Sequence, residues 1–182
     1  MSIPGIILLV LAIVFIYFFN GVIIKRQRWM HNLSLVNVFF KQRMELLTEL
    51  MELLPEALKA GGANVRTMID EYDFHAALQQ KSELDERLTS ALKKWYSTLK
   101  ELPEFQAEGA LKKALAQLER CEGFLTSARI EYNRSAENLN RVISLPVWKI
   151  FAARMKIKPQ EQWAIPADEW AKPLPITKLY VK

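Results

Sequence analysis

The chain has 182 residues, a net charge of +5 and one cysteine, which excludes an internal disulfide. It carries no phosphate-binding loop, glycine fingerprint or serine-histidine-aspartate set, which argues against an enzyme and against a cofactor or small-molecule substrate. Much of the positive excess lies in one short segment, and no basic run with interleaved aromatic residues follows it, so nucleic acid is not an expected partner.

The N-terminal segment is the strongest feature of the sequence. The run 3–24 has no charged residue, and Asn20 is its one strongly polar side chain. As a helix it would be about 33 Å long, enough to cross a hydrocarbon core of about 30 Å. A cleaved signal peptide would have basic residues before the apolar run and small residues after it, and this sequence has neither. We therefore predict an uncleaved transmembrane anchor over residues 1–24.

A basic cluster follows the apolar run at once. Lys25, Arg26, Arg28 and Trp29 are the residues expected at the membrane interface, in contact with lipid headgroups. Cytoplasmic flanks carry the excess of lysine and arginine, and the lone Cys121 fits a reducing compartment. The sequence thus predicts a single-pass protein of a bacterial inner membrane, with its N-terminus outside and the remainder in the cytoplasm.

Residues 25–158 are predicted to form an all-α domain. Breakers at Gly61-Gly62, Pro103 and Pro146 delimit helical segments 25–60, 64–101 and 104–144, each with apolar residues at spacings of three and four. Segments of similar length joined by short turns predict an elongated antiparallel bundle of three to four helices. The first segment should continue from the anchor as one helix, and the second is patchy at 79–83, where a break is an alternative.

The C-terminal tail, 159–182, contains Pro159, Pro166, Pro173 and Pro175, so it should be extended, with a short strand at 176–181. In a bundle with three helices the tail would leave at the end far from the membrane. Trp163 and Trp170 are expected either to contact another subunit or to pack within the chain.

Few residues are candidates for metal binding or catalysis. Asp70, Glu71, Asp73 and His75 include a carboxylate and a histidine four apart on a predicted helix, but one histidine is too few for a structural metal site, and a solvated helix face is favoured. Cys121 lies in an apolar stripe with no histidine nearby, which favours a small buried side chain over a nucleophile.

Three asparagines are candidates for specific contacts. Asn133 and Asn140 are seven residues apart on one helical face, where they either specify a register or partner or are simply exposed. Asn20, near the end of the apolar run, is a candidate for a hydrogen bond between neighbouring anchors in an oligomer.

Two stretches of the sequence form a recognisable pattern. The first reads Phe19-Asn20, Arg26-Gln27, Val36-Asn37-Val38 and Lys41-Gln42-Arg43. The second reads Glu122, Ala128-Arg129, Tyr132-Asn133, Asn140, Ile143 and Leu145-Pro146, with Trp163 beyond it. Together they resemble LemA family proteins. The chain departs from that family where Leu139 replaces a usual tyrosine, Leu145 a phenylalanine, and a Gly-Phe pair is missing near Met155-Lys156.

The resemblance implies a transmembrane anchor and an antiparallel bundle of long helices, and no catalytic motif that could be carried over. Some members of the family take part in building intracellular membrane compartments, and others are encoded beside membrane metalloproteases. The expected function is therefore a non-enzymatic membrane scaffold that forms a homo-oligomer. The alternative is an adaptor of a membrane metalloprotease or of an envelope-stress pathway, with another membrane protein as its partner.

Overall fold

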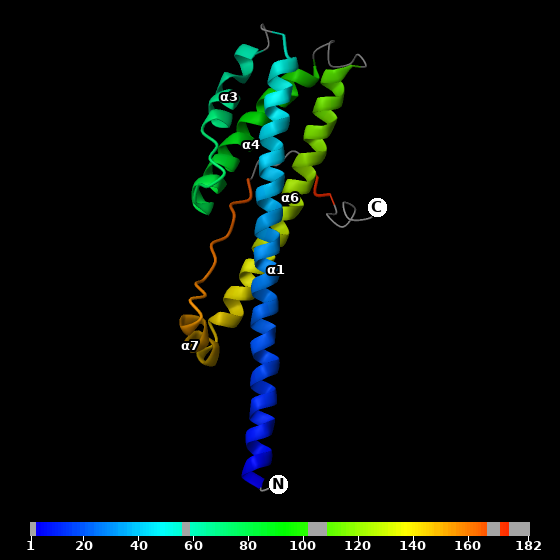
Figure 1. The fold of residues 1–182 in the computed structure, drawn as a ribbon. Helices are drawn as coiled ribbons and strands as arrows, with labels where there is room; N and C mark the ends of the chain where they lie inside the picture. Colours follow the sequence, from blue (N-terminus) through cyan, green and yellow to red (C-terminus); the bar gives the residue numbers. More distant parts are fainter. Residues whose placement is uncertain (1–2, 56–58, 102–108, 167–171, 175–182) are drawn as a thin grey trace.

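The computed structural model describes residues 3–55, 59–101, 109–166 and 172–174. These residues form helices joined by turns and extended segments, with no β-strand among them, which confirms the predicted all-α class. The elements in chain order are α1 (Ile3–Leu53), the 3-10 helix η1 (Ala60–Gly62), α3 (Ala63–Asp70), α4 (Leu78–Lys100), α6 (Ala110–Ile143) and α7 (Pro146–Arg154) (Figure 1). Trp170 and the strand expected at 176–181 lie outside the described residues.

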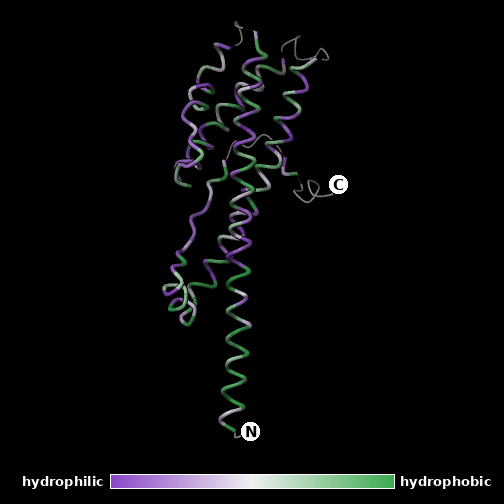
Figure 2. The backbone as a smooth tube through the Cα atoms, viewed as in Figure 1, coloured by the Kyte–Doolittle hydropathy of each residue, from purple (hydrophilic) through white to green (hydrophobic). Residues whose placement is uncertain are grey.

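Helix α1 joins the apolar N-terminal segment to the bundle without a break, as predicted. It has 51 residues, so its length is about 77 Å. The apolar segment at its N-terminal end projects beyond the bundle, whereas its C-terminal half is packed inside the bundle (Figure 2). The helix ends at Leu53 instead of the expected residue 60, because Pro55 disfavours the helical conformation of the residue before it.

The predicted second helix, 64–101, is two helices. Helix α3 ends at Asp70, and a turn leads into α4 at Leu78. The Asp73 carboxylate accepts a 2.8 Å hydrogen bond from the backbone N–H of His75, and the Asp73 carbonyl accepts one of 3.2 Å from Ala76. An aspartate that bonds the backbone two residues on favours a turn over a continued helix. The break thus precedes the patchy stretch at 79–83.

This additional turn changes the topology of the bundle. Helices α1, α3, α4 and α6 alternate in direction, so that α6 ends beside the N-terminal half of α1 (Figure 1). The tail begins at that end and runs back along the bundle. The expectation that the tail leaves at the far end, which assumed three helices, is therefore wrong.

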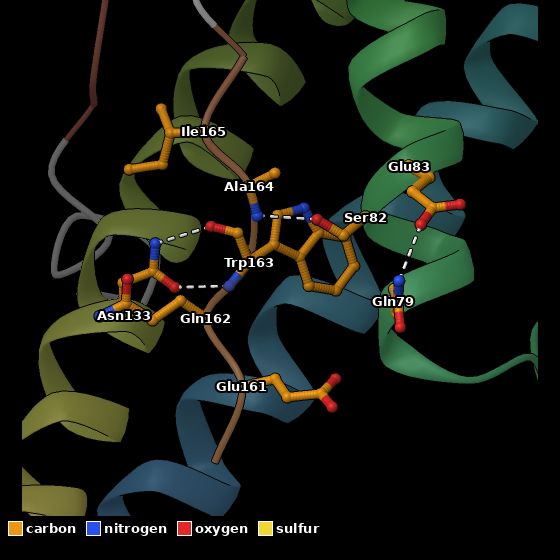
Figure 3. Close-up of a pocket in the computed structure, with 9 residues that line it drawn as sticks. All are labelled: Gln79, Ser82, Glu83, Asn133, Glu161, Gln162, Trp163, Ala164 and Ile165. Carbon is orange, nitrogen blue, oxygen red and sulfur yellow. Dashed lines mark hydrogen bonds between the residues drawn. The ribbon is translucent and has the colours of Figure 1, made fainter.

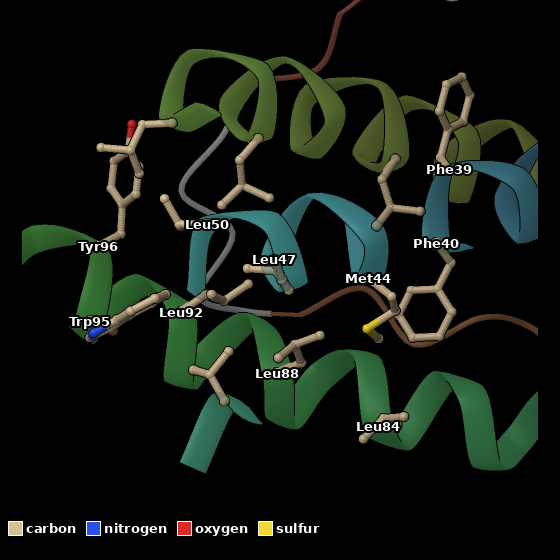
Figure 4. Packing of buried hydrophobic residues seen from close by; sticks show 14 of the residues in the cluster. Phe39, Phe40, Met44, Leu47, Leu50, Leu84, Leu88, Leu92, Trp95 and Tyr96 are labelled. Atoms are coloured by element: carbon tan, nitrogen blue, oxygen red, sulfur yellow. The ribbon is translucent and has the colours of Figure 1, made fainter. Parts of the chain in front are cut away.

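The main core lies between α1, α4 and α6. Its members recur at spacings of three and four along each helix, which places them on one face (Figure 4). Fully buried members include Phe40, Leu47, Leu50, Leu88, Leu92, Leu118 and Leu125. Gly62 allows η1 to approach this core, because a Cβ there would lie 2.8 Å from the Met51 methyl and 2.9 Å from the Trp95 ring.

A second buried group, the proximal cluster, lies at the end where α6 meets the middle of α1. It consists of Val22, Leu139, Ile143, Ala152 and Ile157. The cluster joins α1, α6, α7 and the start of the tail, and Trp29 packs against both it and the main core. The bundle thus covers part of the apolar run itself, since Val22 is only 5% exposed.

Candidate functional site

The N-terminal half of α1 is the first candidate functional surface. Within the described chain, α1 is the helix long and apolar enough to cross a membrane. Its large side chains between Ile3 and Phe18 are exposed, with Leu8 at 71% and Tyr17 at 76%. An exposed apolar surface of this extent marks an interaction site in a stable protein.

The residues predicted at the membrane interface lie where this apolar surface meets the bundle. Arg26 and Arg28 are exposed, and Lys25 is half-buried. Trp29 is also half-buried and is used largely for packing between the two core clusters. The basic side chains are therefore accessible at the end of the apolar surface, whereas the tryptophan packs inside the bundle.

Four charged residues form an ionic cluster inside the bundle. Asp85 of α4 accepts hydrogen bonds from Arg129 of α6, at 2.7 Å from Nε and 2.6 Å from Nη2, and a further bond from Arg43 of α1. Arg43 Nε lies 2.5 Å from Glu122 Oε1, and its Nη2 donates to Thr89 Oγ1 at 2.9 Å. Two guanidinium groups thus face two carboxylates, a balance that offsets the desolvation of each charge.

The ionic cluster joins the helices and offers no surface to a ligand. Side chains of Arg43, Asp85 and Arg129 are 0% exposed, and that of Glu122 is 3% exposed. Burial raises the pKa of Glu122, and the neighbouring guanidinium groups of Arg43 and Arg129 oppose that shift. A site of this kind specifies how three helices pack and cannot bind a substrate without opening.

The tail is held against α6 by the two asparagines that the sequence singled out. Asn133 donates from Nδ2 to the Trp163 carbonyl at 2.8 Å and accepts from the Trp163 N–H at 2.7 Å (Figure 3). Asn140 bonds the backbone of Gln160 in the same two ways, at 2.8 and 2.7 Å. We call this arrangement, residues 160–164 with Asn133 and Asn140, the tail clasp.

Trp163 connects the tail clasp to the ionic cluster. Its side chain is 1% exposed, and its indole Nε1 donates to Asp85 Oδ2 at 2.7 Å. The next residue, Ala164, donates its N–H to the Ser82 hydroxyl at 2.7 Å. Asn133, Asn140 and Trp163, predicted as contacts with another subunit or partner, are thus engaged within the chain. Asn20, by contrast, is exposed on α1.

A hollow of about 490 Å³ opens on the surface beside the tail clasp, between α4, α6 and the tail (Figure 3). Its lining includes Gln79 and Glu83, which are hydrogen-bonded to each other at 3.0 Å. Ser82 in the lining is engaged by the tail, because its hydroxyl accepts the Ala164 N–H.

The other candidates do not converge. Glu71 pairs with Arg87 at 3.2 Å, and because α3 ends at Asp70, Glu71 and His75 do not share a helix face. Across the described ranges, no group of three His, Cys, Asp or Glu residues is suited to a metal ion. Cys121 is buried, its Sγ lies 3.5 Å from the Phe39 carbonyl, and burial raises its pKa to about 12.

Sequence reasoning did not identify the ionic cluster, although a signal for it exists. Each of its charged residues follows or precedes core residues by three or four positions. Glu122 lies between Leu118 and Leu125, Asp85 comes three residues before Leu88, and Arg129 comes three residues before Tyr132. A charged residue there must find an opposite charge from another helix. Four such residues with two charges of each sign would have predicted one shared cluster.

Comparison with known proteins gives one match. The model of the LemA family matches residues 32–176. No curated protein and no solved structure matches the chain. Several residues quoted for the resemblance converge in the structure: Arg43, Glu122 and Arg129 in the ionic cluster, and Asn133, Asn140 and Trp163 in the tail clasp.

Proposed function

The chain belongs to the LemA family, and from that premise we propose that it is a membrane-anchored scaffold without catalytic activity. In this proposal it self-associates into a large homo-oligomer that organises or shapes the bacterial inner membrane. The N-terminus of α1 lies outside and the bundle lies in the cytoplasm, as the basic residues Lys25, Arg26 and Arg28 favour.

The continuity of α1 carries the proposal. One helix of 51 residues includes both the exposed apolar segment and the face that forms the main core. No loop separates the two, so a tilt or displacement of the bundle is transmitted to the apolar segment. Side-by-side packing of many bundles would then act on the bilayer, as a scaffold requires.

The surface available for self-association is the exposed half of α1. The tail tryptophan Trp163 is buried within the chain, so it is not available for a contact between subunits. Asn20 is exposed on an apolar helix, and a side-chain amide in lipid is stabilised by a hydrogen bond to a neighbouring helix. We therefore assign the first contact between subunits to Asn20.

The mass of the detergent-solubilised particle, measured by mass photometry at native expression levels, tests the proposal. We expect a large homo-oligomer whose mass falls in Asn20→Leu. The control Ile16→Leu, at an exposed apolar position, should keep the mass of the wild type. A strictly monomeric wild-type particle would overturn the scaffold. Stoichiometric recovery of a different membrane protein from a pull-down would instead support the adaptor alternative.

A further inference from the structure

Helix α7 lies against the apolar half of α1. The Phe15 ring of α1 is 5.1 Å from that of Phe151 and 6.2 Å from that of Trp148, measured between centroids. The Phe18 ring is 6.1 Å from that of Trp148. These contacts place α7 beside residues that belong to the segment able to span a membrane.

The outer face of α7 is apolar and uncovered within the described chain. Val147 is 61% exposed and Ile150 is 73% exposed, and Leu145, just before the helix, is 50% exposed. Val147 and Ile150 are three residues apart and therefore neighbours on one helix face. The same helix contacts the apolar part of α1 through Trp148 and Phe151.

Basic residues accompany this apolar face. Lys149, Arg154, Lys156 and Lys158 lie within the segment 144–160, which contains no acidic residue. A hollow of about 440 Å³ between α6, α7 and the start of the tail has Lys149 and Lys158 in its lining, together with apolar Ile143 and Ile157. Apolar side chains flanked by lysines match the chemistry of an acyl chain below an anionic headgroup.

The level of α7 along α1 fits a membrane interface. Val22 belongs to the same buried cluster as Leu139 and Ile143, so the bundle covers one side of α1 from this level on. Asn20, two residues before Val22, has an exposed polar side chain. Phe15 lies about 8 Å from Asn20 along the helix axis, toward the N-terminus of α1. Interfacial helices bury their apolar face by about 5–10 Å, which agrees with this depth.

We infer that residues 145–158 form an interfacial membrane-binding element that inserts Val147 and Ile150 below anionic phospholipid headgroups. The inference rests on the proposed anchoring of α1. Contact with the spanning segment and the excess of basic charge favour a lipid surface over a protein partner. A second attachment beside α1 would fix the tilt of the bundle relative to the bilayer.

Spin labels attached to single cysteines, in the full chain reconstituted into vesicles, test the inference. In a Cys121→Ala background, Ile150→Cys reports on α7, Leu8→Cys on the span and Ser97→Cys on the exposed surface of α4. We expect the label at Ile150→Cys to be protected from collisions with a water-soluble nickel chelate, as is the label at Leu8→Cys. The label at Ser97→Cys should remain accessible to the chelate. A label fully accessible at Ile150→Cys but protected at Leu8→Cys overturns the inference and leaves the anchor intact. Full accessibility at Leu8→Cys overturns the anchor itself.

The preference for anionic lipid is tested by vesicle composition. Protection at Ile150→Cys should increase from phosphatidylcholine alone to an equal mixture with phosphatidylglycerol. The double variant Lys149→Gln/Lys158→Gln should lose that increase, whereas Lys112→Gln/Lys113→Gln, at the far end of α6, should keep it. Equal protection in both vesicle types, or an equal loss in both double variants, contradicts a role for the lysines of residues 145–158.

Discussion

The carboxylate of Asp85 in α4 accepts a 2.7 Å hydrogen bond from the indole of Trp163, a residue of the tail. The same carboxylate accepts hydrogen bonds from Arg129 of α6 and Arg43 of α1. One acidic side chain therefore connects three helices and the tail. Residues 160–164 are a part of the bundle rather than a free extension of it.

Asp85→Asn should strongly destabilise the bundle. The amide keeps the shape of the side chain but removes one negative charge, which leaves two buried guanidinium groups facing Glu122 alone. Breaking a buried ion pair costs about 3–5 kcal/mol. Urea unfolding of the full chain in detergent, followed by circular dichroism, measures the loss. The exposed Asp70→Asn should change stability by less than about 0.5 kcal/mol, and an equal effect of both substitutions would contradict a structural role for the cluster.

Asn133→Ala should release the tail locally. Two hydrogen bonds to the Trp163 backbone are lost, each of which contributes about 1 kcal/mol. Hydrogen exchange measured residue by residue should show faster exchange of the Trp163 amide. The Gln160 amide, which Asn140 holds, serves as an internal control and should keep its protection. Unchanged exchange at Trp163 would show that the indole alone fixes the tail.

The helical bundle and the continuity of α1 were predictable because they follow from local patterns. Apolar residues at spacings of three and four recur over long segments, and neither glycine nor proline interrupts the chain between Gly21 and Pro55. The end of α1 could also have been placed, because Pro55 marks it within two residues.

The reversal after α3 was not predictable with the same rules. The turn contains neither glycine nor proline, and its local cause is a hydrogen bond from His75 to the Asp73 side chain. Turns built on an aspartate resemble a solvated helix face in a sequence. One such turn added a helix to the bundle and moved the start of the tail from the far end to the end beside the apolar half of α1.

The tail clasp was only half predictable. The spacing of Asn133 and Asn140 places them on one face, which the sequence shows, but their partners are backbone groups of Trp163 and Gln160. A backbone partner leaves no trace in residue identities. The sequence could therefore indicate that the two side chains act together without indicating what they bind.

Lys156→Gly should stabilise the chain by about 1 kcal/mol. Lys156 follows α7 with a φ of 54°, in the left-handed region that favours glycine. Backbone bonds from Lys156 to Ala153 and from Ile157 to Ala152 fix this conformation. The missing glycine of the LemA pattern falls near this position. In urea unfolding, Ala153→Gly is the control, because glycine inside the last turn of α7 should instead destabilise by about 0.5–1 kcal/mol. Loss of stability in both variants would contradict the prediction.

Cys121 should be unreactive in the folded protein. Burial raises the pKa of its thiol to about 12, so the reactive thiolate is scarce at neutral pH. We expect N-ethylmaleimide to modify Cys121 only after denaturation, as measured by intact mass. Ser97→Cys, which adds an exposed thiol on α4, should take up one label at once. Rapid labelling of the wild type in native buffer would show that α6 opens.

Glu122→Gln should change how stability depends on pH. Burial raises the pKa of Glu122 above the usual 4.5 despite the opposing guanidinium groups, so the folded state holds this proton more tightly than the unfolded state. The contribution of that proton to stability is therefore fully present below pH 4.5 and is lost as pH rises through the higher folded pKa. Glutamine cannot titrate, so the variant lacks this contribution to the pH dependence.

The quantity to measure is the difference in unfolding free energy between the wild type and Glu122→Gln, from urea unfolding at a series of pH values. The stability of the wild type relative to the variant should be greatest below pH 4.5 and should decrease as pH rises above it. The exposed Glu137→Gln should follow the wild type across the series. A difference that is constant, or that increases with pH, would mean that the guanidinium group of Arg43 outweighs burial and that Glu122 is ionised within the cluster throughout.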